Sequence, residues 1–365
     1  MERLTIKDIA RLAGVSPATV SRVINNVRYG VGEKTRDRIL AIVQESGYHP
    51  NLVARSMITK RSSTIGLIVP DITNPFYALL VKGVEDVASR LGYGVVLCNS
   101  DNSDEKEHAN LSYLKETYVA GIIYNNYRTI DQRNRALLEE ISVPVVYVDN
   151  QDKPRDGVSL HVRQKEGMVI MTRYLLDMGH RRFAYLAGPR GVYSAEERLR
   201  GFLATLKAMK VEIHPSFIKY CDYSENGGYE VARELLGEKK KFTCLVCAND
   251  LIAYGATLLL TERGVRLPDD VSITGYDDIP FSKLLNPALT TIYHPVQDMG
   301  RRAIEIIDRL IRNDPDHTPG EMLFDPFLVK RNSVRFIGLS HPDAAADTAD
   351  VHGPRALASG IDLPD

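Results

Sequence analysis

The chain has 365 residues, 44% of them hydrophobic, with 46 Lys and Arg against 47 Asp and Glu. This length and apolar content suffice for two or three domains with buried cores, and the sequence has no run of about 18 apolar residues that could span a membrane. Its N-terminus lacks the profile of a secretory signal, and its four cysteines are too scattered for a disulfide scaffold, so we expect a cytoplasmic protein.

Residues 5–25 predict two short helices joined by a tight turn. Thr5 can cap the first helix, and Asp8 can complete a capping box with it. Gly14 supplies a left-handed residue that ends this helix, and Pro17 begins the second one with a preset backbone angle. Two such helices form the helix-turn-helix unit that reads DNA, although a plain helical hairpin would show the same pattern.

The outward face of the second helix is small, polar and singly cationic, as a surface that enters a DNA groove should be. It carries Pro17, Ala18, Ser21, Arg22 and Asn25. Residues 1–61 hold 11 Lys and Arg against 5 Asp and Glu, a charge of +6, while the rest of the chain carries −7. A basic head on an acidic body favours a polyanion as the partner of the head.

A third helix is predicted over residues 33–46, and it completes a small all-α head within residues 1–49. Residues 50–62 have helical propensity but are too few to form a stable helix alone. They are either a plain linker or a hinge helix that folds when two copies meet on DNA. In the second case, the residues that contact the minor groove and its phosphates would be Ala54, Arg55 and Met57.

From Thr64 onward, apolar strands alternate with helices, the βαβ pattern of parallel sheets covered on both faces. Beyond the strands that begin at Thr64 and Gly94, the predicted strands are 121–124, 145–149, 183–187, 243–247 and 271–275. The predicted helices are 77–91, 105–116, 167–178, 195–209, 227–236, 251–263 and 296–311. These units are too many for one modest sheet, so we expect an α/β core of two doubly wound parallel-sheet lobes over residues 63–336. Residues 337–365 predict an acidic, disordered tail.

Five polar clusters directly follow predicted strands, at the sheet edge where doubly wound folds bind small molecules. They are residues 71–77, 99–101, 149–150, 249–250 and 277–278. Any one cluster could instead cap a helix or form a turn, because Asp and Asn favour both positions. Together with Arg198 and with the aromatic rings of Phe76 and Tyr223, they favour a site for a neutral polyhydroxylated ligand or a similar small polar molecule.

The sequence lacks the motifs of common enzyme classes. It has no G-x-G-x-x-G after a strand, no Walker loop, no G-x-S-x-G and no H-E-x-x-H. Cys244 and Cys247 form a C-x-x-C pattern within an apolar run that predicts a buried strand, and His180 lies in a turn between a helix and a strand, so we expect structural roles for all three. We therefore expect no enzyme activity, no metal and no cofactor.

Eight segments of the chain resemble motifs of the lactose-repressor/galactose-repressor (LacI/GalR) family of bacterial transcription factors. The resemblance runs from Leu4 to about Arg335 and rests on TIKDIARLAGVSPATVSRVIN, PNLVARSM, IGLIVPDITNPFYALLVKGVED, MGHRRFAYLAGP, ERLRGF, CANDLIAYGA, VSITGYDDIPF and LTTIYHPVQDMG. It implies a homodimer, or a dimer of dimers, on a palindromic operator. It also implies a periplasmic-binding-protein-like core that senses an effector, a sugar or sugar derivative, between its lobes. The alternatives are control by a phosphoprotein co-effector and a solute-binding module without DNA function.

The resemblance assigns roles to individual positions. The family's base-reading positions are Pro17, Ala18 and Arg22 in this chain. Its phosphate-contacting positions are Thr5, Ser16, Ser21 and Asn25. Its effector-binding positions are Phe76, Asp149, Arg198, Tyr223, Asn249 and Asp277. Among the base-reading residues only Arg22 can pair with guanine through two hydrogen bonds, worth about 1–3 kcal/mol of discrimination, so we expect it to carry most of the direct readout.

The chain departs from the family pattern at four places. Met57 replaces the usual leucine of the hinge, and Gly32 replaces the usual serine before the third helix, which should cost only a few tenths of a kcal/mol, roughly. Val162 and Arg163 stand where many members have Asp-Asn, so the effector contacts of that loop are not carried over. The acidic tail extends beyond the usual end of the family.

Overall fold

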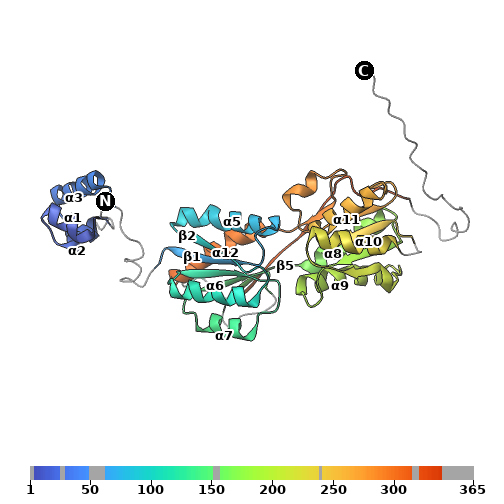
Figure 1. Cartoon of the computed structure of the whole chain (residues 1–365), viewed down its shortest axis with the longest axis horizontal. Helices are drawn as coiled ribbons and strands as arrows, with labels where there is room; N and C mark the ends of the chain where they lie inside the picture. The colour runs from blue at the N-terminus through green and yellow to red at the C-terminus, as the bar shows by residue number, and fades with distance from the viewer. Residues whose placement is uncertain are drawn as a thin grey trace, which may run out of the picture. The chain divides into compact units, whose positions relative to one another are not determined.

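A computed structural model of the chain describes residues 4–24, 29–48, 62–150, 157–237, 241–314 and 320–338. These residues form a helical head and an α/β core that divides into two compact units (Figure 1). Unit 1 of the core lies before Gln164 and in Pro295–Asp325, and unit 2 comprises Gln164–His294 and the residues from Pro326 onward. Four of the predicted DNA-contacting residues lie outside the described residues: Asn25, Ala54, Arg55 and Met57.

The head consists of the three predicted helices, α1 (Ile6–Ala13), α2 (Pro17–Ile24) and α3 (Glu33–Ser46). The Thr5 amide donates to the Asp8 carboxylate at 2.9 Å, and Gly14 has a φ of 61°, so the predicted start and end signals of α1 are confirmed. Gly32 is the N-cap of α3 and provides no side-chain cap, as its missing side chain requires. The core of the head is formed by Ile9, Ala10, Ala13, Val20, Val23 and Ile39.

Unit 1 is built on one parallel sheet with the strand order β11-β5-β4-β3-β1-β2. Its strands are β1 (Thr64–Val69), β2 (Gly94–Asn99), β3 (Gly121–Asn125), β4 (Val145–Val148), β5 (Val158–Val162) and β11 (Glu321–Phe324). Its helices are α5 (Pro75–Leu91), α6 (Asp104–Glu116), α7 (Gln132–Glu140) and α12 (Val296–Ile311). Figure 1 shows α5 on one face of this sheet and α6 and α7 on the other. Gly66 of β1 faces Leu114 of α6, and Gly121 of β3 faces Ile307 of α12, so both faces are covered.

Helices α5 and α12 pack at backbone contact distance because glycines lie at their crossing. A Cβ atom added to Gly83 would lie 2.0 Å from the carbonyl oxygen of Gln297, and one added to Gly300 would lie 2.5 Å from that of Leu80. We expect Gly83→Ala to lower the free energy of unfolding of unit 1 by about 3 kcal/mol, because neither helix backbone can yield. Gly94→Ala is the control, since nothing lies within 4 Å of its added Cβ. Urea denaturation measures both variants, and equal midpoints would contradict the close packing.

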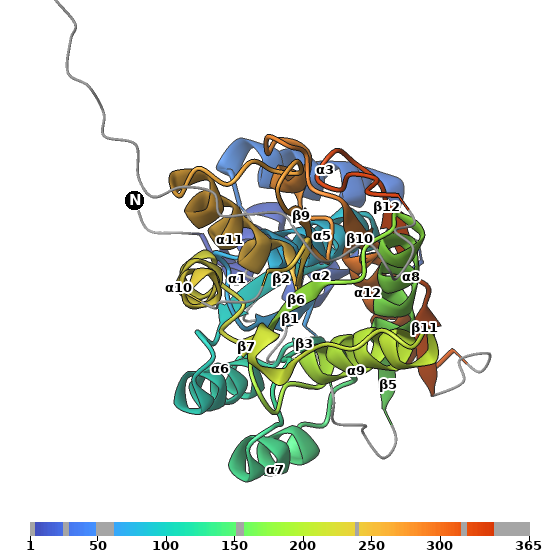
Figure 2. The same ribbon diagram turned by 90° about the vertical axis from the view of Figure 1, so that its right-hand side faces the viewer.

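Unit 2 contains a parallel sheet of order β7-β6-β8-β9 and a small antiparallel pair, β10 with β12. Its strands are β6 (Phe183–Ala187), β7 (Ile218–Tyr220), β8 (Cys244–Cys247), β9 (Ser272–Thr274), β10 (Thr291–Tyr293) and β12 (Phe327–Val329). Its helices are α8 (Gln164–Asp177), α9 (Tyr193–Ala208), α10 (Glu225–Leu236) and α11 (Asp250–Glu262), and two short 3₁₀ turns lie at Pro215–Phe217 and Pro280–Lys283. In Figure 2, α8 and α9 lie on one side of the sheet and α10 and α11 on the other.

The two cysteines of the C-x-x-C pattern are fully buried on β8, so the prediction of a buried strand is confirmed. Each of the predicted core helices is present, with ends that differ from the prediction by at most three residues. Among the described residues, no helix is long and apolar enough to cross a membrane.

His180 occupies the predicted turn between α8 and β6, where it is fully buried and its Nδ1 lies 3.0 Å from the hydroxyl of Thr243. Burial lowers the pKa of His180 to about 4, and the charges of Arg335 and Arg181 add to this effect. The unfolded chain therefore binds a proton at this residue near pH 6.5, and the folded chain does so only near pH 4. His180 therefore does not lower the free energy of unfolding above pH 6.5. As the pH falls from 6.5 to about 4, it lowers the free energy of unfolding by up to about 3 kcal/mol.

This acid sensitivity should be absent in a variant that lacks the histidine. We expect urea midpoints of His180→Gln to change less between pH 7.5 and 4.5 than those of the unmodified protein. His214→Gln is the control, because His214 is an exposed histidine of the same unit. An identical pH dependence in His180→Gln and the unmodified protein would contradict a neutral buried His180.

Candidate functional site

The base-reading residues proposed for the head share one face of α2. Pro17, Ala18 and Arg22 are exposed, while Val20 and Val23 on the opposite face are buried in the head. The Arg22 guanidinium is therefore presented by a packed helix, and a DNA base is the kind of planar acceptor that it can reach. The geometry is consistent with groove reading, and the assignment of these residues to bases stays a prediction.

Two of the proposed phosphate contacts have a structural role in the head. The Thr5 hydroxyl donates to the Asp8 carboxylate at 2.7 Å, and this contact, with the Thr5 amide, lowers the pKa of Asp8. The Ser16 hydroxyl accepts from the Thr19 amide at 3.2 Å and so caps α2. Both hydroxyls lie at helix N-termini, where free backbone amides favour an anion. Ser21 is half-buried on α2.

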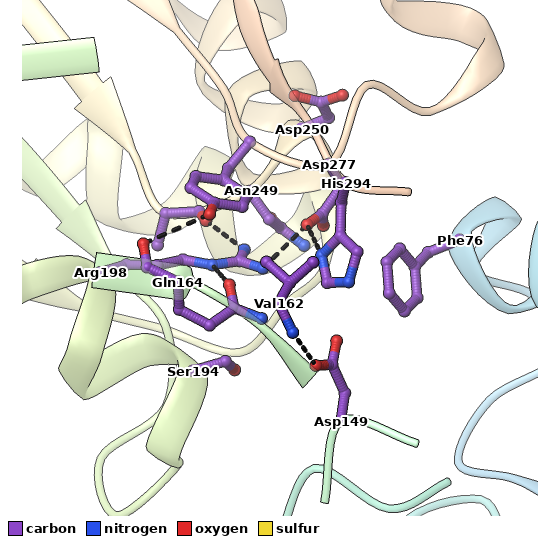
Figure 3. A network of polar contacts seen from close by, with 12 residues as sticks. Phe76, Asp149, Val162, Gln164, Ser194, Arg198, Asn249, Asp250, Asp277 and His294 are labelled. Atoms are coloured by element: carbon purple, nitrogen blue, oxygen red, sulfur yellow. Dashed lines mark hydrogen bonds and ion pairs between the residues drawn. The ribbon is translucent and has the colours of Figure 1, made fainter. Parts of the chain in front are cut away.

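In unit 2 the proposed effector residues Arg198 and Asp277 form a buried ion pair, 79 positions apart in the sequence (Figure 3). Nη2 of Arg198 donates to Oδ1 of Asp277 at 2.9 Å, and the two side chains are 5% and 8% exposed. The Nε atom of Arg198 donates to Oε1 of Gln164 at 2.8 Å, and the Nη1 atom of Arg198 donates to the carbonyl oxygen of Ala248 at 2.7 Å. Helix α9, the loop after β9, helix α8 and the end of β8 thus meet at one guanidinium.

Aromatic rings enclose this guanidinium. Its carbon lies 3.8 Å from the centre of the Tyr276 ring and 5.9 Å from that of Tyr223. Burial alone lowers the pKa of Arg198, but Asp277 and the neighbouring tyrosine hydroxyls outweigh it, so the pKa is raised and the side chain stays charged. The hydroxyl oxygens of Tyr223 and Ser194 lie 3.3 Å apart. A rigid arginine with a carboxylate and aromatic faces can hold ligand hydroxyls on one side and a sugar ring on the other.

Three residues that the sequence did not single out belong to this network. Gln164 accepts from Arg198, and Nδ1 of the buried His294 lies 3.6 Å from Oδ1 of Asp277. Asp250, counted only as part of a strand-end cluster, is fully buried beside the Asp277 loop. Gln164 could be missed because the predicted helix began at residue 167, whereas α8 begins at Gln164. His294 follows β10, a strand of three residues with no periodic signal.

Asn249 is buried at the N-cap of α11, where its Oδ1 accepts from the amide of Ile252 at 2.9 Å. This contact is the capping role that was weighed against ligand binding in the sequence. Asp278, next to Asp277, forms an ion pair with Arg331 at 2.6 Å instead of joining the Arg198 network. The strand-end clusters of unit 2 therefore combine structural caps with groups available for a ligand.

In unit 1 the proposed residues also lie at the carboxyl ends of strands. Asp149, with a left-handed φ of 47°, follows β4, and its Oδ1 accepts from the amide of Val162 at 3.2 Å. Phe76 lies in the first turn of α5, which Asn74 caps by accepting from the Phe76 amide at 3.0 Å. Arg163, at the departure from the family pattern, pairs with Asp325 at 2.9 Å.

A buried amide ladder supports this edge of unit 1. Nδ2 of Asn125 donates to the carbonyl oxygen of Val148 at 2.8 Å, and Nδ2 of Asn150 donates to that of Asn126 at 2.9 Å. The amide group of Asn126 in turn donates to the buried carboxyl group of Glu107 at 2.6 Å. The loops after β3 and β4 are therefore fixed to each other, although no spacing pattern in the sequence predicts these contacts.

Comparison with known proteins agrees with both parts of the chain. Residues 5–51 match "Bacterial regulatory proteins, lacI family", and residues 62–323 match "Periplasmic binding proteins and sugar binding domain of LacI family". The ribose operon repressor of Halalkalibacterium halodurans is 36% identical over 319 residues, which cover 85% of this chain and 91% of the relative. Such relatives are transcriptional repressors and not enzymes.

Two solved structures extend the comparison. The lac repressor dimer bound to operator and the anti-inducer ONPF is 30% identical, has a TM-score of 0.82, and matches 92% of this chain and all of its own. A LacI family transcriptional regulator from Enterococcus faecium with bound ribose is 27% identical, has a TM-score of 0.68, and matches 75% of this chain and all of its own. The resemblance inferred from the motifs is therefore confirmed. The chain belongs to the LacI family of bacterial regulatory proteins and is a DNA-binding repressor with an effector-binding core.

Proposed function

We propose that this repressor binds a palindromic operator as a cytoplasmic homodimer and releases or grips it in response to a sugar or sugar derivative. The buried Arg198–Asp277 pair carries the proposal, because a charged pair at the carboxyl ends of parallel strands presents fixed donors and acceptors to a polar ligand. The ribose found in the Enterococcus faecium regulator supports a carbohydrate as the ligand class. The lac repressor dimer on its operator supports a paired head.

The proposed ligand contacts are those that the family resemblance assigns: Phe76, Asp149, Arg198, Tyr223, Asn249 and Asp277. The placement of the effector between the two lobes rests on the same resemblance. Carboxylate and amide oxygens accept hydrogen bonds from sugar hydroxyls, and Arg198 donates to them. A neutral polyhydroxylated ligand satisfies both kinds of group without adding an unpaired charge.

Control of DNA binding then follows from linkage. A ligand that binds more tightly to one state of the core shifts the repressor toward that state, and DNA bound by the heads must change the ligand affinity by the same factor. The proposal does not depend on whether the ligand weakens or strengthens operator binding. Either sign gives a reciprocal effect.

A thermal-shift panel tests the ligand class. The panel contains D-ribose, other pentoses, hexoses, their phosphates, nucleosides and purines. We expect one sugar or close derivative to stabilise the protein, by about 2.7 kcal/mol at a concentration of 100 Kd. Stabilisation by a purine alone would contradict a sugar as the ligand and would indicate a purine instead. No stabilisation by any member, together with operator binding that changes only when a phosphorylated partner protein is added, would favour the phosphoprotein alternative.

A further inference from the structure

Asp250 is a fully buried carboxyl group at the start of α11, and three donors converge on it. Oδ2 accepts from the Ile279 amide at 2.9 Å and from the Ser282 hydroxyl at 2.5 Å, while Oδ1 accepts from the Thr291 hydroxyl at 2.6 Å. Ser282 and Thr291 are themselves fully buried. The carboxyl group therefore connects α11, the turn after β9 and strand β10.

These contacts lie on both sides of Asp277. The Asp250 amide donates to the carbonyl oxygen of Tyr276 at 2.9 Å, and the Asp250 carboxyl group holds Ile279. Gly275 is required at its position because an added Cβ would lie 2.1 Å from Oδ1 of Asp250. Asp277 itself has a φ of 107°, a conformation that non-glycine residues rarely adopt and that its surroundings must enforce.

We propose that Asp250 is a positioning residue for the effector site: it fixes the backbone on both sides of Asp277 and thereby orients the Arg198 guanidinium. Figure 3 shows Asp250 above Asp277 and His294. The proposal rests on the proposed function only in naming Asp277 as an effector residue. Its structural content, that Asp250 controls the Arg198–Asp277 pair, needs no ligand.

The charge of Asp250 provides a way to observe this control. Burial, followed by the nearby charge of Asp277, raises the pKa of Asp250 to about 7, against the opposing effect of its three hydrogen bonds. An ionised carboxyl group accepts all three hydrogen bonds, whereas a protonated one must give up an acceptor site. The position of Asp277 should therefore change as the pH passes through this range.

Other titratable groups near Asp250 must be separated from it. Those that face it or its partner Asp277 are Cys247 on β8, Tyr254 on α11, Arg198 on α9 and His294 after β10. Burial raises the pKa of both Cys247 and Tyr254, and that of Arg198 is raised as well, so these three do not titrate near neutral pH. His294 is the group that a variant must exclude.

The test uses full-length protein with ¹⁵N-labelled arginine and no ligand or DNA. The NMR signal of the Arg198 Nε–Hε group, identified by its loss in Arg198→Lys, is followed from pH 5.5 to 8.5. We expect this signal to shift with a midpoint near pH 7 in the unmodified protein and in His294→Gln. In Asp250→Asn, which keeps the shape of the side chain but cannot titrate, we expect a signal that stays fixed.

Two further variants complete the design. Asp270→Asn is the matched control, because Asp270 also accepts several hydrogen bonds from Arg266 but lies away from Asp277. In this variant the Arg198 Nε–Hε signal should shift as it does in the unmodified protein. The Nε–Hε proton of Arg198 should exchange with solvent about tenfold faster in Asp250→Ala than in Asp250→Asn, because only the asparagine can still accept a hydrogen bond from the loop that carries Asp277.

Three results would overturn the proposal: a shift in Asp250→Asn equal to that of the unmodified protein, loss of the shift in His294→Gln, or no shift in the unmodified protein. The last two can be measured even if the Asp250 variants do not fold. Because no ligand is present, a failed ligand panel leaves these results unaffected, and the two proposals fail independently.

Discussion

Replacing Arg22 with alanine is expected to reduce operator affinity by about 1–3 kcal/mol for each head, because the arginine is the only outward residue of α2 that can read a guanine with two hydrogen bonds. Pro17 and Ala18 have no side-chain donor or acceptor, so neighbouring positions cannot compensate. Arg22 is exposed and Val20 and Val23 form the buried side of α2, so the variant should fold normally.

The measurement is fluorescence anisotropy on a palindromic site selected from a random duplex pool, with a scrambled duplex beside it. On the scrambled duplex, Arg22→Ala should lose only the small, salt-dependent contribution of one charge. Arg38→Ala removes the same charge from an exposed position of α3 and serves as the control. An equal loss on selected and scrambled DNA would show that Arg22 only contacts phosphate.

Replacing Asp277 with asparagine is expected to abolish the response of operator binding to the ligand found in the panel. Asparagine preserves the shape of the side chain and tolerates a positive φ, but it removes the charge that Arg198 faces at 2.9 Å. The free energy of unfolding should fall by about 1.5–3 kcal/mol, because one charged and buried hydrogen bond is weakened.

Alanine is a poorer choice at this position. It would leave the buried guanidinium of Arg198 without a carboxylate, and breaking a buried pair in this way costs about 3–5 kcal/mol. Loss of ligand binding in Asp277→Ala could then reflect unfolding.

Asp278→Asn is the matched control for this experiment. Asp278 is the next residue, also has a left-handed φ, and pairs with Arg331 at 2.6 Å. We expect Asp278→Asn to lose stability and to keep the ligand response. An unchanged ligand affinity in Asp277→Asn would remove Asp277 from the site.

Sequence patterns predicted the long elements of this fold well. Helix 296–311 and strand 183–187 have the predicted ends, because each has a strong periodic pattern and a clear boundary residue. Helix α7, with a polar sequence of nine residues, and strands β7, β10, β11 and β12, with three or four residues each, were missed. Segments this short contain too few residues for a period to be recognised.

The limits of the site prediction have a different cause. Parallel strands place their carboxyl ends together, so Asp277 and Asn249 could be assigned to one edge without a structure. The pairing of Arg198 with Asp277, and the convergence of Ile279, Ser282 and Thr291 on Asp250, join residues from 29 to 79 positions apart. Nothing in local periodicity records such contacts. These contacts depend on the order of the strands in the sheet, which only the structure provides.

The decisive measurement is the reciprocity of the two binding reactions. The affinity of the panel ligand is measured by calorimetry with and without saturating selected operator, and the affinity for that operator is measured with and without saturating ligand. If the effector core controls the DNA-binding head, both affinities change by one common factor, typically about 5- to 150-fold, and Asp277→Asn removes both changes. A ligand whose affinity is the same with and without operator would contradict control of this repressor through its core.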